Sequence, residues 1–306
     1  MKKDVSLLIT GANGFTGRHA YQYFSQLDIN VIPMFQTHTR IIEAPNSVVC
    51  DLTNKTAVMS LIKRIKPDYV LHLAGQNSVL ESWKKPLNSL EINIIGTSYL
   101  LEALRKVVPN SKTLILGSAL QHDLTKGTTP PHPYSLSKTM QAMIADAWGE
   151  LMGLDIVIAK PSNLIGPGES TGICSLIGKK LIDIEMGKCE PIIEINDLQA
   201  TRDFLDVRDA VAAYHVLLCA GEKGKKYNIG SGVKRSLLEV LSMYKEITNL
   251  DFRIRETNSV KSKDQSDLIL HDIKKHGWSP KIQFIDSLQD VWEYMRKSRT
   301  SRRSIK

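Results

Sequence analysis

Short apolar runs alternate with segments of helical length through residues 1–160, and this alternation restricts the chain to few folds. Apolar strands joined by helices are typical of a parallel sheet that is covered on both faces. The pattern predicts an α/β fold with a Rossmann-type, doubly wound parallel sheet. The expected strands are Val5–Thr10, Asn30–Phe35, Ser47–Cys50, Tyr69–Leu73, Thr113–Gly117 and Asp155–Lys160, and the expected helices cover 15–26, 54–66, 86–107 and 134–152.

The alternation becomes irregular after Pro161, which predicts a smaller C-terminal lobe. A helical stretch covers 172–187, and strand-like Tyr227–Ile229 indicates that 203–230 returns to the main sheet. A chain of 306 residues, 42% of them hydrophobic, is long enough for both parts. We therefore expect one domain over 1–160, a lobe over 161–295, and a basic, disordered tail over 296–306.

The net charge of +8 is concentrated in that tail. The charged residues of segment 296–306 are all basic, namely Arg296, Lys297, Arg299, Arg302, Arg303 and Lys306. A short, Ser-containing basic tail is more typical of a solvated chain end than of a nucleic-acid site. The sequence contains no run of about 18 apolar residues, so it predicts no membrane helix. The four scattered cysteines show neither metal-ligand nor redox spacing, so we expect a cytoplasmic protein without bound metal.

A glycine-rich turn follows the first strand directly and precedes a helical segment. It reads Gly11-Ala12-Asn13-Gly14-Phe15-Thr16-Gly17. A pyrophosphate needs close backbone approach and a helix N-terminus, whose partial positive charge faces the anion. Glycine spacing alone is weak evidence, but its place between the first strand and the first helix predicts a dinucleotide site.

The residues after the second strand indicate which dinucleotide is bound. NAD sites usually place an acid there for the ribose 2′-hydroxyl, whereas NADP sites need a cation for the 2′-phosphate. The segment from Gln36 to Arg40 contains no acid before Glu43. Arg40 can pair with the phosphate, so NADP(H) is expected, with NAD(H) as the less favoured cofactor. The alternative is an exposed loop arginine. Asp51 and Leu52, just after the third strand, are expected to meet the adenine.

Three residues form the expected catalytic set. Tyr134 and Lys138 lie four apart on a predicted helix and therefore on one face. A nearby ammonium and an oxidised nicotinamide favour the phenolate and lower the phenol pKa towards neutral pH. Ser118 follows the fifth strand, where open sheets bind ligands, and its hydroxyl can hydrogen-bond a reacting carbonyl. His72, inside an apolar strand, is expected to be an ordinary core histidine.

These motifs resemble the extended short-chain dehydrogenase/reductase superfamily. Within it, the second half of the chain is most similar to GDP-6-deoxy-4-keto-D-mannose reductases, and the likeness covers about residues 5–297. The matching segments are Gly11–Gly17, Leu73-Ala74-Gly75, Ser118, Tyr134 with Lys138, Pro161–Ser170, Leu198–Asp209, Tyr227–Gly232 and Gly277–Ile282.

The resemblance implies that NADPH reduces C4 of a nucleotide-linked 4-keto-6-deoxy sugar, best matched by GDP-4-keto-6-deoxy-D-mannose and giving GDP-D-rhamnose. Tyr134 would donate the proton, Lys138 would hold the nicotinamide ribose, and Ser118 would polarise the ketone. It also implies a homodimer formed through the helices near 86–107 and 134–152. The implied cofactor residues include Leu73, Ala74, Gly75, Asn93 and Pro161 besides the glycine turn, and the implied substrate residues are Asn77, Ser78, Ser118, Asn163, Lys179, Arg202 and Lys261.

Several alternatives stay open. Asn163 can cap a turn, Lys179 can be a solvated charge, and Arg202 can pair with Asp203 or Asp206. The family commonly has an acidic residue after its serine or threonine, where this chain has Ala119-Leu120. These side chains cannot exchange protons, which excludes a 4,6-dehydratase. A nucleotide-sugar 4-epimerase that recycles bound NAD, and a non-catalytic NADP-binding protein, are the competing functions.

Overall fold

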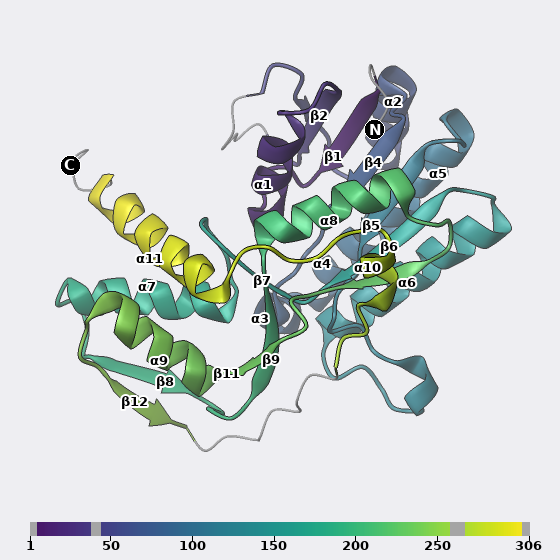
Figure 1. Ribbon diagram of the computed structural model, residues 1–306. Helices are drawn as coiled ribbons and strands as arrows, with labels where there is room; N and C mark the ends of the chain where they lie inside the picture. The colour runs from purple at the N-terminus through teal and green to yellow at the C-terminus, as the bar shows by residue number, and fades with distance from the viewer. Residues whose placement is uncertain (1–4, 38–43, 258–266, 302–306) are drawn as a thin grey trace. The chain divides into compact units, whose positions relative to one another are not determined.

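The computed structural model describes residues 5–37, 44–257 and 267–301, and the chain divides into two compact units (Figure 1). The first unit comprises Met1–Pro161, Val211–Asn228 and His271–Trp278. The second comprises Ser162–Ala210, Ile229–Leu270 and Ser279–Lys306. The segment that returns to the first unit therefore begins at Val211, later than the expected 203, and a second return at His271–Trp278 had no signal in the sequence.

A seven-stranded sheet forms the centre of the first unit, in the order β10-β6-β5-β4-β1-β2-β3. The pairs β1–β2, β1–β4, β2–β3, β4–β5 and β5–β6 are parallel. Strand β1 lies between β2 and β4, so the carboxyl ends of β1 and β4 flank the switch point where such sheets bind ligands. This topology confirms the doubly wound fold. The strands are β1 (Ser6–Thr10), β2 (Asn30–Phe35), β3 (Val48–Val49), β4 (Tyr69–His72), β5 (Lys112–Leu116), β6 (Ile156–Pro161) and β10 (Lys226–Ile229).

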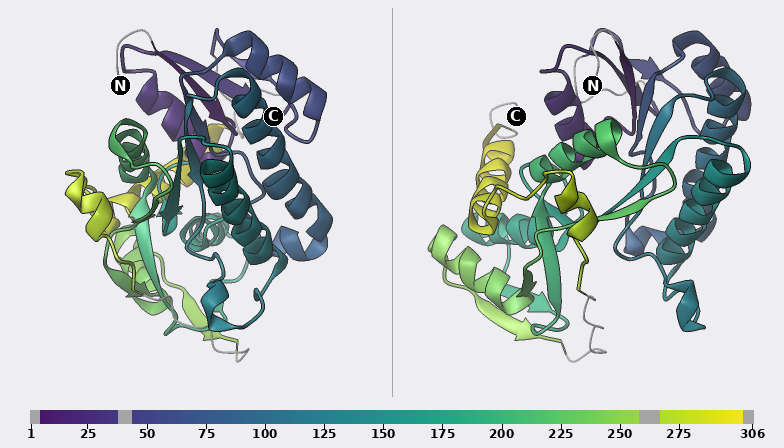
Figure 2. Two further views of the ribbon diagram at one scale, coloured as in Figure 1. Left: turned by 90° about the vertical axis from the view of Figure 1, so that its right-hand side faces the viewer. Right: turned by 45° about the vertical axis from the view of Figure 1, so that its right-hand side comes forward.

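Helices cover both faces of this sheet (Figure 2). On one face, α2 (Lys55–Ile65), α5 (Thr97–Val107) and α6 (Pro133–Leu151) bury an apolar core against the strands. On the other face, α1 (Phe15–Phe24) lies beside α8 (Val207–Ala220), where the Tyr23 hydroxyl lies 3.0 Å from His215 Nδ1. Shorter helices are α3 (Val79–Lys84), η2 (Leu124–Lys126) and α10 (His271–Lys275).

The single helix expected over 86–107 consists of three parts. Helix α4 (Pro86–Leu90) runs into η1, a π-helical turn (Glu91–Gly96), and then into α5. Such wide turns inside helices are rare and often lie at functional sites. The turn here contains Asn93.

The second unit contains a three-stranded sheet in the order β11-β9-β7 and a two-stranded sheet β12-β8. Three helices bury a common core in which Leu181, Tyr244 and Leu288 are fully buried. The strands are β7 (Asn163–Ile165), β8 (Ile192–Ile195), β9 (Thr201–Asp206), β11 (Lys234–Ser236) and β12 (Arg253–Glu256), and the helices are α7 (Ile173–Glu185), α9 (Leu237–Thr248) and α11 (Phe284–Ser301).

The C-terminal segment is helical at the point where the sequence predicted a disordered tail to begin. Helix α11 continues through Ser301, so the prediction is wrong for 296–301, and 302–306 lie outside the described residues. The helix persists because Trp292 and Met295 are buried in the core of the second unit and Lys297 pairs with Glu293 one turn away.

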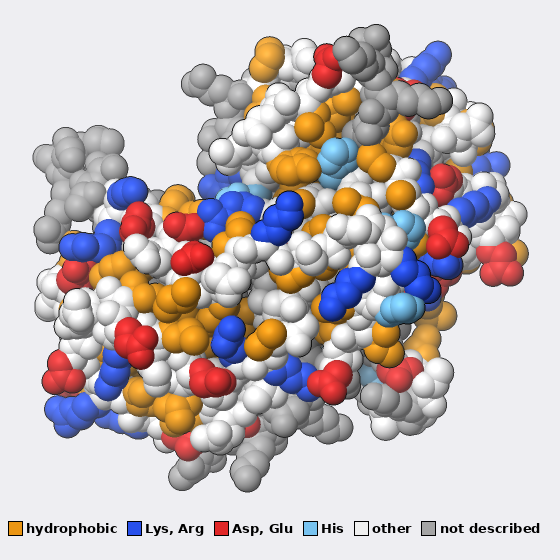
Figure 3. All heavy atoms as spheres, in the orientation of Figure 1, with side chains coloured by type: hydrophobic (Ala, Val, Ile, Leu, Met, Phe, Trp, Pro, Cys, Tyr) orange, Lys and Arg blue, Asp and Glu red, His pale blue; other side chains and the backbone are white. Residues whose placement is uncertain are grey.

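The surface shows mixed charge. On the face drawn in Figure 3, Lys and Arg side chains intermingle with Asp and Glu, and the described residues there form no continuous basic track. Among the helices that the structure describes, none is long and apolar enough to cross a membrane.

Candidate active site

The glycine turn joins β1 to α1 and leaves no space for side chains at its first and last glycines. Gly11 has a φ of +70°, and a Cβ atom there would lie 2.7 Å from the backbone nitrogen of Ala74. A Cβ atom on Gly17 would lie 2.2 Å from the carbonyl oxygen of Gly11. Glycine is therefore required because the start of α1 packs directly against the ends of β1 and β4.

The beginning of α1 fits the phosphates of a dinucleotide. Gly14 caps the helix with an extended backbone, and in this fully described helix no side chain caps the first turn and no acid lies in it. Backbone amides at such a turn, together with the helix dipole, favour an anion. Asn13, Phe15 and Thr16 are partly exposed around the exposed Gly14, so the expected cofactor residues of the turn share one surface.

The segments expected to bind the adenosine end are described only in part. Arg40 belongs to 38–43, outside the described residues, so its contact with a 2′-phosphate stays a prediction. Asp51 Oδ1 accepts hydrogen bonds from the amide and hydroxyl of Thr53, at 2.9 and 2.8 Å. Leu52 is buried, and its Cβ atom would lie 3.1 Å from a Cβ atom on Gly96. The adenine contact of Asp51 and Leu52 also stays a prediction.

Ser118 and Tyr134 meet beyond the carboxyl end of β5. Ser118 follows that strand by two residues, and Tyr134 lies in the first turn of α6. The two residues are only 8% and 6% exposed, and Ser118 is close enough to Tyr134 to lower the pKa of its phenol as a hydrogen-bonding group. The Ser118 Oγ also accepts from the amide of Leu120 at 3.1 Å. The contact with the backbone fixes the serine hydroxyl beside the phenol.

The pKa of Tyr134 is raised, mainly by burial, and the hydrogen bond with Ser118 lowers it only in part. The lowered pKa predicted from the sequence requires the Lys138 ammonium together with an oxidised nicotinamide; among the protein's own groups, burial disfavours the phenolate most strongly. The phenol is therefore protonated at neutral pH, which is the form that can donate to an alkoxide.

A histidine, to which the sequence analysis assigned no role, orients the start of α6. His132 Nδ1 accepts from the amide of Ser135 at 2.9 Å and caps the helix. The His132 ring stacks on Tyr134 with centroids 6.0 Å apart and an interplanar angle of 18°. The proline that follows His132 marks a helix start and was the available signal.

Lys138 lies one helical turn after Tyr134, with its ammonium buried beside the strand ends. Its side chain is 6% exposed, and Nζ donates to the Leu116 carbonyl and to Gln141 Oε1, both at 2.8 Å. Burial lowers the pKa of Lys138 to about 8. A Cβ atom on Gly75 would lie 3.5 Å from Nζ. In the Leu73-Ala74-Gly75 segment, the backbone of Gly75 thus lies close to the ammonium with no side chain between them.

Asn93 connects the segment after β4 to α6. Its Oδ1 accepts from the Gln76 amide at 2.8 Å, and its Nδ2 donates to the Gln76 carbonyl at 3.0 Å and to Ser137 Oγ at 2.9 Å. Ser137 in turn donates to the Tyr134 carbonyl at 2.9 Å. Asn93 is fully buried, so its side chain orders the helix that carries Tyr134.

The expected substrate residues Asn77 and Ser78, and the expected cofactor residue Pro161, flank this arrangement. Asn77 is exposed, while the Ser78 hydroxyl caps α3 by accepting from the Glu81 amide at 3.2 Å. Pro161 ends β6, and its carbonyl accepts from the Ala119 amide at 3.2 Å. Within the described residues, no group of three or more His, Cys, Asp or Glu side chains could hold a metal ion.

The three expected substrate residues that the structure describes in the second unit have contacts within the protein. Asn163 Nδ2 donates to the Asp203 carbonyl at 2.9 Å, Lys179 pairs with Glu169 at 2.9 Å, and Arg202 donates to the Thr201 carbonyl at 2.7 Å. Lys261 lies outside the described residues. The structure does not bring Asn163, Lys179 and Arg202 into contact through any of these bonds, so their substrate role stays a prediction.

A cavity of about 410 Å³ opens within the second unit and was not foreseen. Isoleucines of α7 and β8 line it, and Lys180 and Arg255 contribute positive charge together with Glu190 and Glu194. Arg255 pairs with Glu194 at 2.8 Å. The cavity was missed because Lys180 and Arg255 occupy amphipathic positions that resemble any solvated helix or strand.

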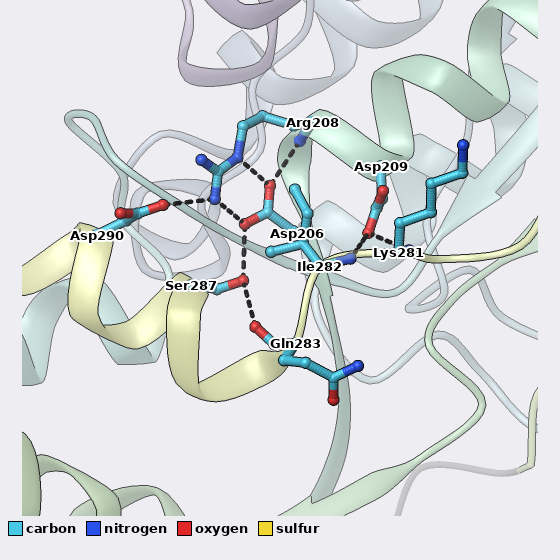
Figure 4. A network of polar contacts seen from close by, with 8 residues as sticks. All are labelled: Asp206, Arg208, Asp209, Lys281, Ile282, Gln283, Ser287 and Asp290. Atoms are coloured by element: carbon cyan, nitrogen blue, oxygen red, sulfur yellow. Dashed lines mark hydrogen bonds and ion pairs between the residues drawn. The ribbon is translucent and has the colours of Figure 1, made fainter.

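A polar cluster ties β9 to α11 in the same unit (Figure 4). The carboxylate of Asp206, fully buried, accepts from Arg208 at 2.8 and 2.7 Å and from Ser287 Oγ at 2.7 Å. Arg208 also pairs with Asp290 at 2.6 Å. Asp203 accepts from the amides of Ser231 and Gly232. Both carboxylates that were alternative partners of Arg202 therefore have other, structural contacts.

Known proteins match the chain along most of its length. It is 29% identical to the GDP-6-deoxy-D-mannose reductase of Pseudomonas aeruginosa over 94% of the chain and 97% of the relative. It is 26% identical to a UDP-glucose 4-epimerase of Yersinia enterocolitica over 95% of the chain and 98% of the relative.

The fold matches solved structures equally well. RMD from Pseudomonas aeruginosa complexed with NADPH superimposes with a TM-score of 0.83 at 26% identity, covering 96% of this chain and 99% of that one. The model of the NAD dependent epimerase/dehydratase family matches residues 7–230, which hold the glycine turn, Ser118, Tyr134 and Lys138. The resemblance seen in the sequence is thereby confirmed, and the chain belongs to the NAD dependent epimerase/dehydratase family.

Proposed function

We propose that this protein is an NADPH-dependent reductase of a nucleotide-linked 4-keto-6-deoxy sugar. The observation that carries the proposal is the buried pair formed by Ser118 and the protonated Tyr134, one helical turn from the buried Lys138. The likeness to the GDP-6-deoxy-D-mannose reductase supports GDP-4-keto-6-deoxy-D-mannose as the substrate and GDP-D-rhamnose as the product.

The chain's own residues account for the proton in this reaction. NADPH, when bound, supplies the hydride that the ketone carbon receives. Tyr134 donates its phenol proton to the ketone oxygen, while Ser118 orients that oxygen by a hydrogen bond. Lys138 holds the nicotinamide ribose and places positive charge near the phenolate that is left after proton transfer.

NADPH as the cofactor is supported by three observations. The glycine turn fits a dinucleotide, no acid precedes Glu43 after β2, and the Pseudomonas aeruginosa structure contains NADPH. Arg40 would pair with the 2′-phosphate. NAD(H) is the less favoured cofactor.

The nucleotide-diphosphate part of the substrate is assigned to the second unit. Arg202, Asn163, Lys179 and Lys261 would hold the diphosphate, a role suited to cations and amide donors.

A homodimer through the helices near 86–107 and 134–152 is part of the proposal. Leu136, Met140 and Met143 are 37%, 40% and 52% exposed, and their spacing places them on one face of α6. Trp83 on the neighbouring α3 is 62% exposed. A second copy of the same apolar face would cover these side chains.

The decisive experiment is an NADPH-oxidation assay with GDP-, dTDP-, CDP- and UDP-linked 4-keto-6-deoxy sugars, with the product's stereochemistry determined by NMR. We expect one NADP⁺ released for each sugar reduced and the highest kcat/KM with the GDP sugar. Interconversion of 4-epimers without net cofactor oxidation would instead establish a 4-epimerase, which the 26% identical relative makes the second candidate. Cofactor binding without turnover of any keto sugar would leave a non-catalytic NADP-binding protein.

A further inference from the structure

The ammonium of Lys138 is held by neutral groups only, as far as the described contacts extend. Two of its three N–H donors go to the Leu116 carbonyl and to Gln141 Oε1. The carbonyl is fixed by β5, but Gln141 is a side chain of α6, three residues after Lys138. Its amide must therefore be held in place by something else.

A buried chain of hydrogen bonds holds that amide. Gln141 Nε2 donates to Thr97 Oγ1 at 2.8 Å, and Thr97 Oγ1 donates to the Asn93 carbonyl at 2.8 Å. Gln141 is 1% exposed, while Thr97 and Asn93 are fully buried. The amide can have only this orientation, because the flipped amide would direct its N–H groups at the ammonium.

The chain continues to the end of β1 through His72. Its Nε2 lies 2.9 Å from Thr97 Oγ1, and its Nδ1 lies 2.8 Å from Thr10 Oγ1, which accepts from the Ala74 amide. Every contact is satisfied if neutral His72 donates from Nε2 and accepts at Nδ1. Burial and the charge of Lys138 lower the pKa of His72 to about 3, so the ring is neutral. The expected core histidine is therefore also the far anchor of Gln141.

We propose that Gln141 is a positioning residue, which directs the Lys138 ammonium through a neutral acceptor anchored on Thr97. For catalysis this inference rests on the proposed reductase function. A carboxylate at position 141 would bind the ammonium as an ion pair and remove the hydrogen bond that Gln141 donates to Thr97. An apolar side chain would leave the ammonium with one acceptor fewer.

Few titratable groups face Lys138. His72 faces it from β4, and Tyr134 lies on its own helix; β5 contributes the Leu116 carbonyl, and η1 contributes the neutral Asn93. A change at position 141 is therefore expected to act on the pKa of Lys138 directly. Removing the acceptor destabilises the ammonium, whereas adding a carboxylate stabilises it.

The test compares Gln141→Leu and Gln141→Glu with wild-type enzyme. The control is Gln22→Glu, which adds the same charge at an exposed position of α1. The pKa of Lys138 is measured by NMR of ε-¹³C-labelled lysine without substrate, with the signal assigned by its loss in Lys138→Met. We expect the pKa to fall by about one unit in Gln141→Leu and to rise by about one unit in Gln141→Glu.

The same variants are then assayed for reduction as a function of pH. The pKa that limits kcat at alkaline pH should fall in Gln141→Leu and rise in Gln141→Glu. In both variants kcat should fall about 10- to 100-fold, while the sugar KM changes little. Gln22→Glu should match wild type in every measurement.

An unchanged Lys138 pKa in both variants, or wild-type kcat in Gln141→Leu, would overturn the inference. If Gln141→Leu does not fold, Gln141→Glu decides alone, because it keeps the length of the side chain. If wild type reduces no keto sugar but the pKa of Lys138 still shifts in opposite directions, the proposed function fails and the contact between Gln141 and Lys138 stands.

Discussion

The proposed reaction depends on one proton, which the phenol of Tyr134 carries in a buried position. In Tyr134→Phe we expect reduction to fall by about 10²–10⁴-fold, because only the proton donor is removed. NADPH affinity, measured by fluorescence titration, should stay within about twofold of wild type. Tyr69→Phe, at the opposite end of the sheet strands, is the control and should reduce normally. Turnover near the wild-type rate in Tyr134→Phe would refute the assignment.

Arg40 is expected to bind the 2′-phosphate of NADPH, a group that NADH lacks. Arg40→Ala should weaken NADPH about tenfold or more and leave NADH nearly unchanged, because a charge-assisted contact is lost only with NADPH. Dissociation constants for both nucleotides test this directly. Arg105→Ala, which breaks only an ion pair with Glu102, should affect neither. Equal weakening of both nucleotides by Arg40→Ala would contradict this role.

Neutral His72 makes stability depend on pH. Its pKa is about 3 in the folded protein and about 6.5 in the unfolded chain, so below pH 6.5 only the unfolded chain gains this proton. His72 should therefore not lower the free energy of unfolding above pH 6.5. Between pH 7 and pH 5, protonation of His72 in the unfolded chain should lower the free energy of unfolding by about 2 kcal/mol. Urea unfolding at both pH values should show that this loss disappears in His72→Asn. It should persist in His271→Asn, whose histidine is exposed.

At the scale of elements, the contact between α1 and β1 depends on the absence of one Cβ atom. Gly17→Ala places that atom 2.2 Å from the Gly11 carbonyl oxygen, which must move. We expect a loss of about 1–3 kcal/mol in unfolding free energy and weaker NADPH binding, because the turn opens. Gly149→Ala in α6 meets nothing closer than 3.7 Å and should stabilise the protein by about 0.5–1 kcal/mol. Wild-type affinity for NADPH in Gly17→Ala would show that the glycine turn does not bind the dinucleotide as proposed.

Strands β1, β2, β4 and β6 could be predicted because each is a largely apolar run. β2 was predicted to the residue, and β1 and β4 to within one. The π-helical turn at Glu91–Gly96 could not be predicted, since its apolar spacing does not distinguish a wide turn from an α-helical one and the turn is stabilised by the buried contacts of Asn93. Gln141 was missed for a similar reason. A glutamine on an amphipathic helix resembles a surface residue until Thr97 and Lys138 are placed beside it.

At the scale of the whole molecule, the stripe formed by Leu136, Met140 and Met143 predicts a dimer. Met143→Glu should convert it to a monomer, because two buried carboxylates would face each other across a twofold axis. Light scattering after gel filtration measures the mass. Leu238→Glu, which adds the same charge at a 38% exposed leucine of α9, should remain dimeric. A wild-type monomer at micromolar concentration would exclude this interface.

The packing of α11 on the earlier helices α7 and α9 has a consequence for synthesis. Leu288, Val291, Trp292 and Met295 complete the core of the second unit, and Ser287 and Asp290 close the cluster around Asp206 and Arg208. Before α11 has been synthesised and has docked, α7 and α9 expose the apolar surface that it covers. The second unit can therefore finish folding only after residues 284–301 have left the ribosome, and an exposed core of this kind is prone to aggregation.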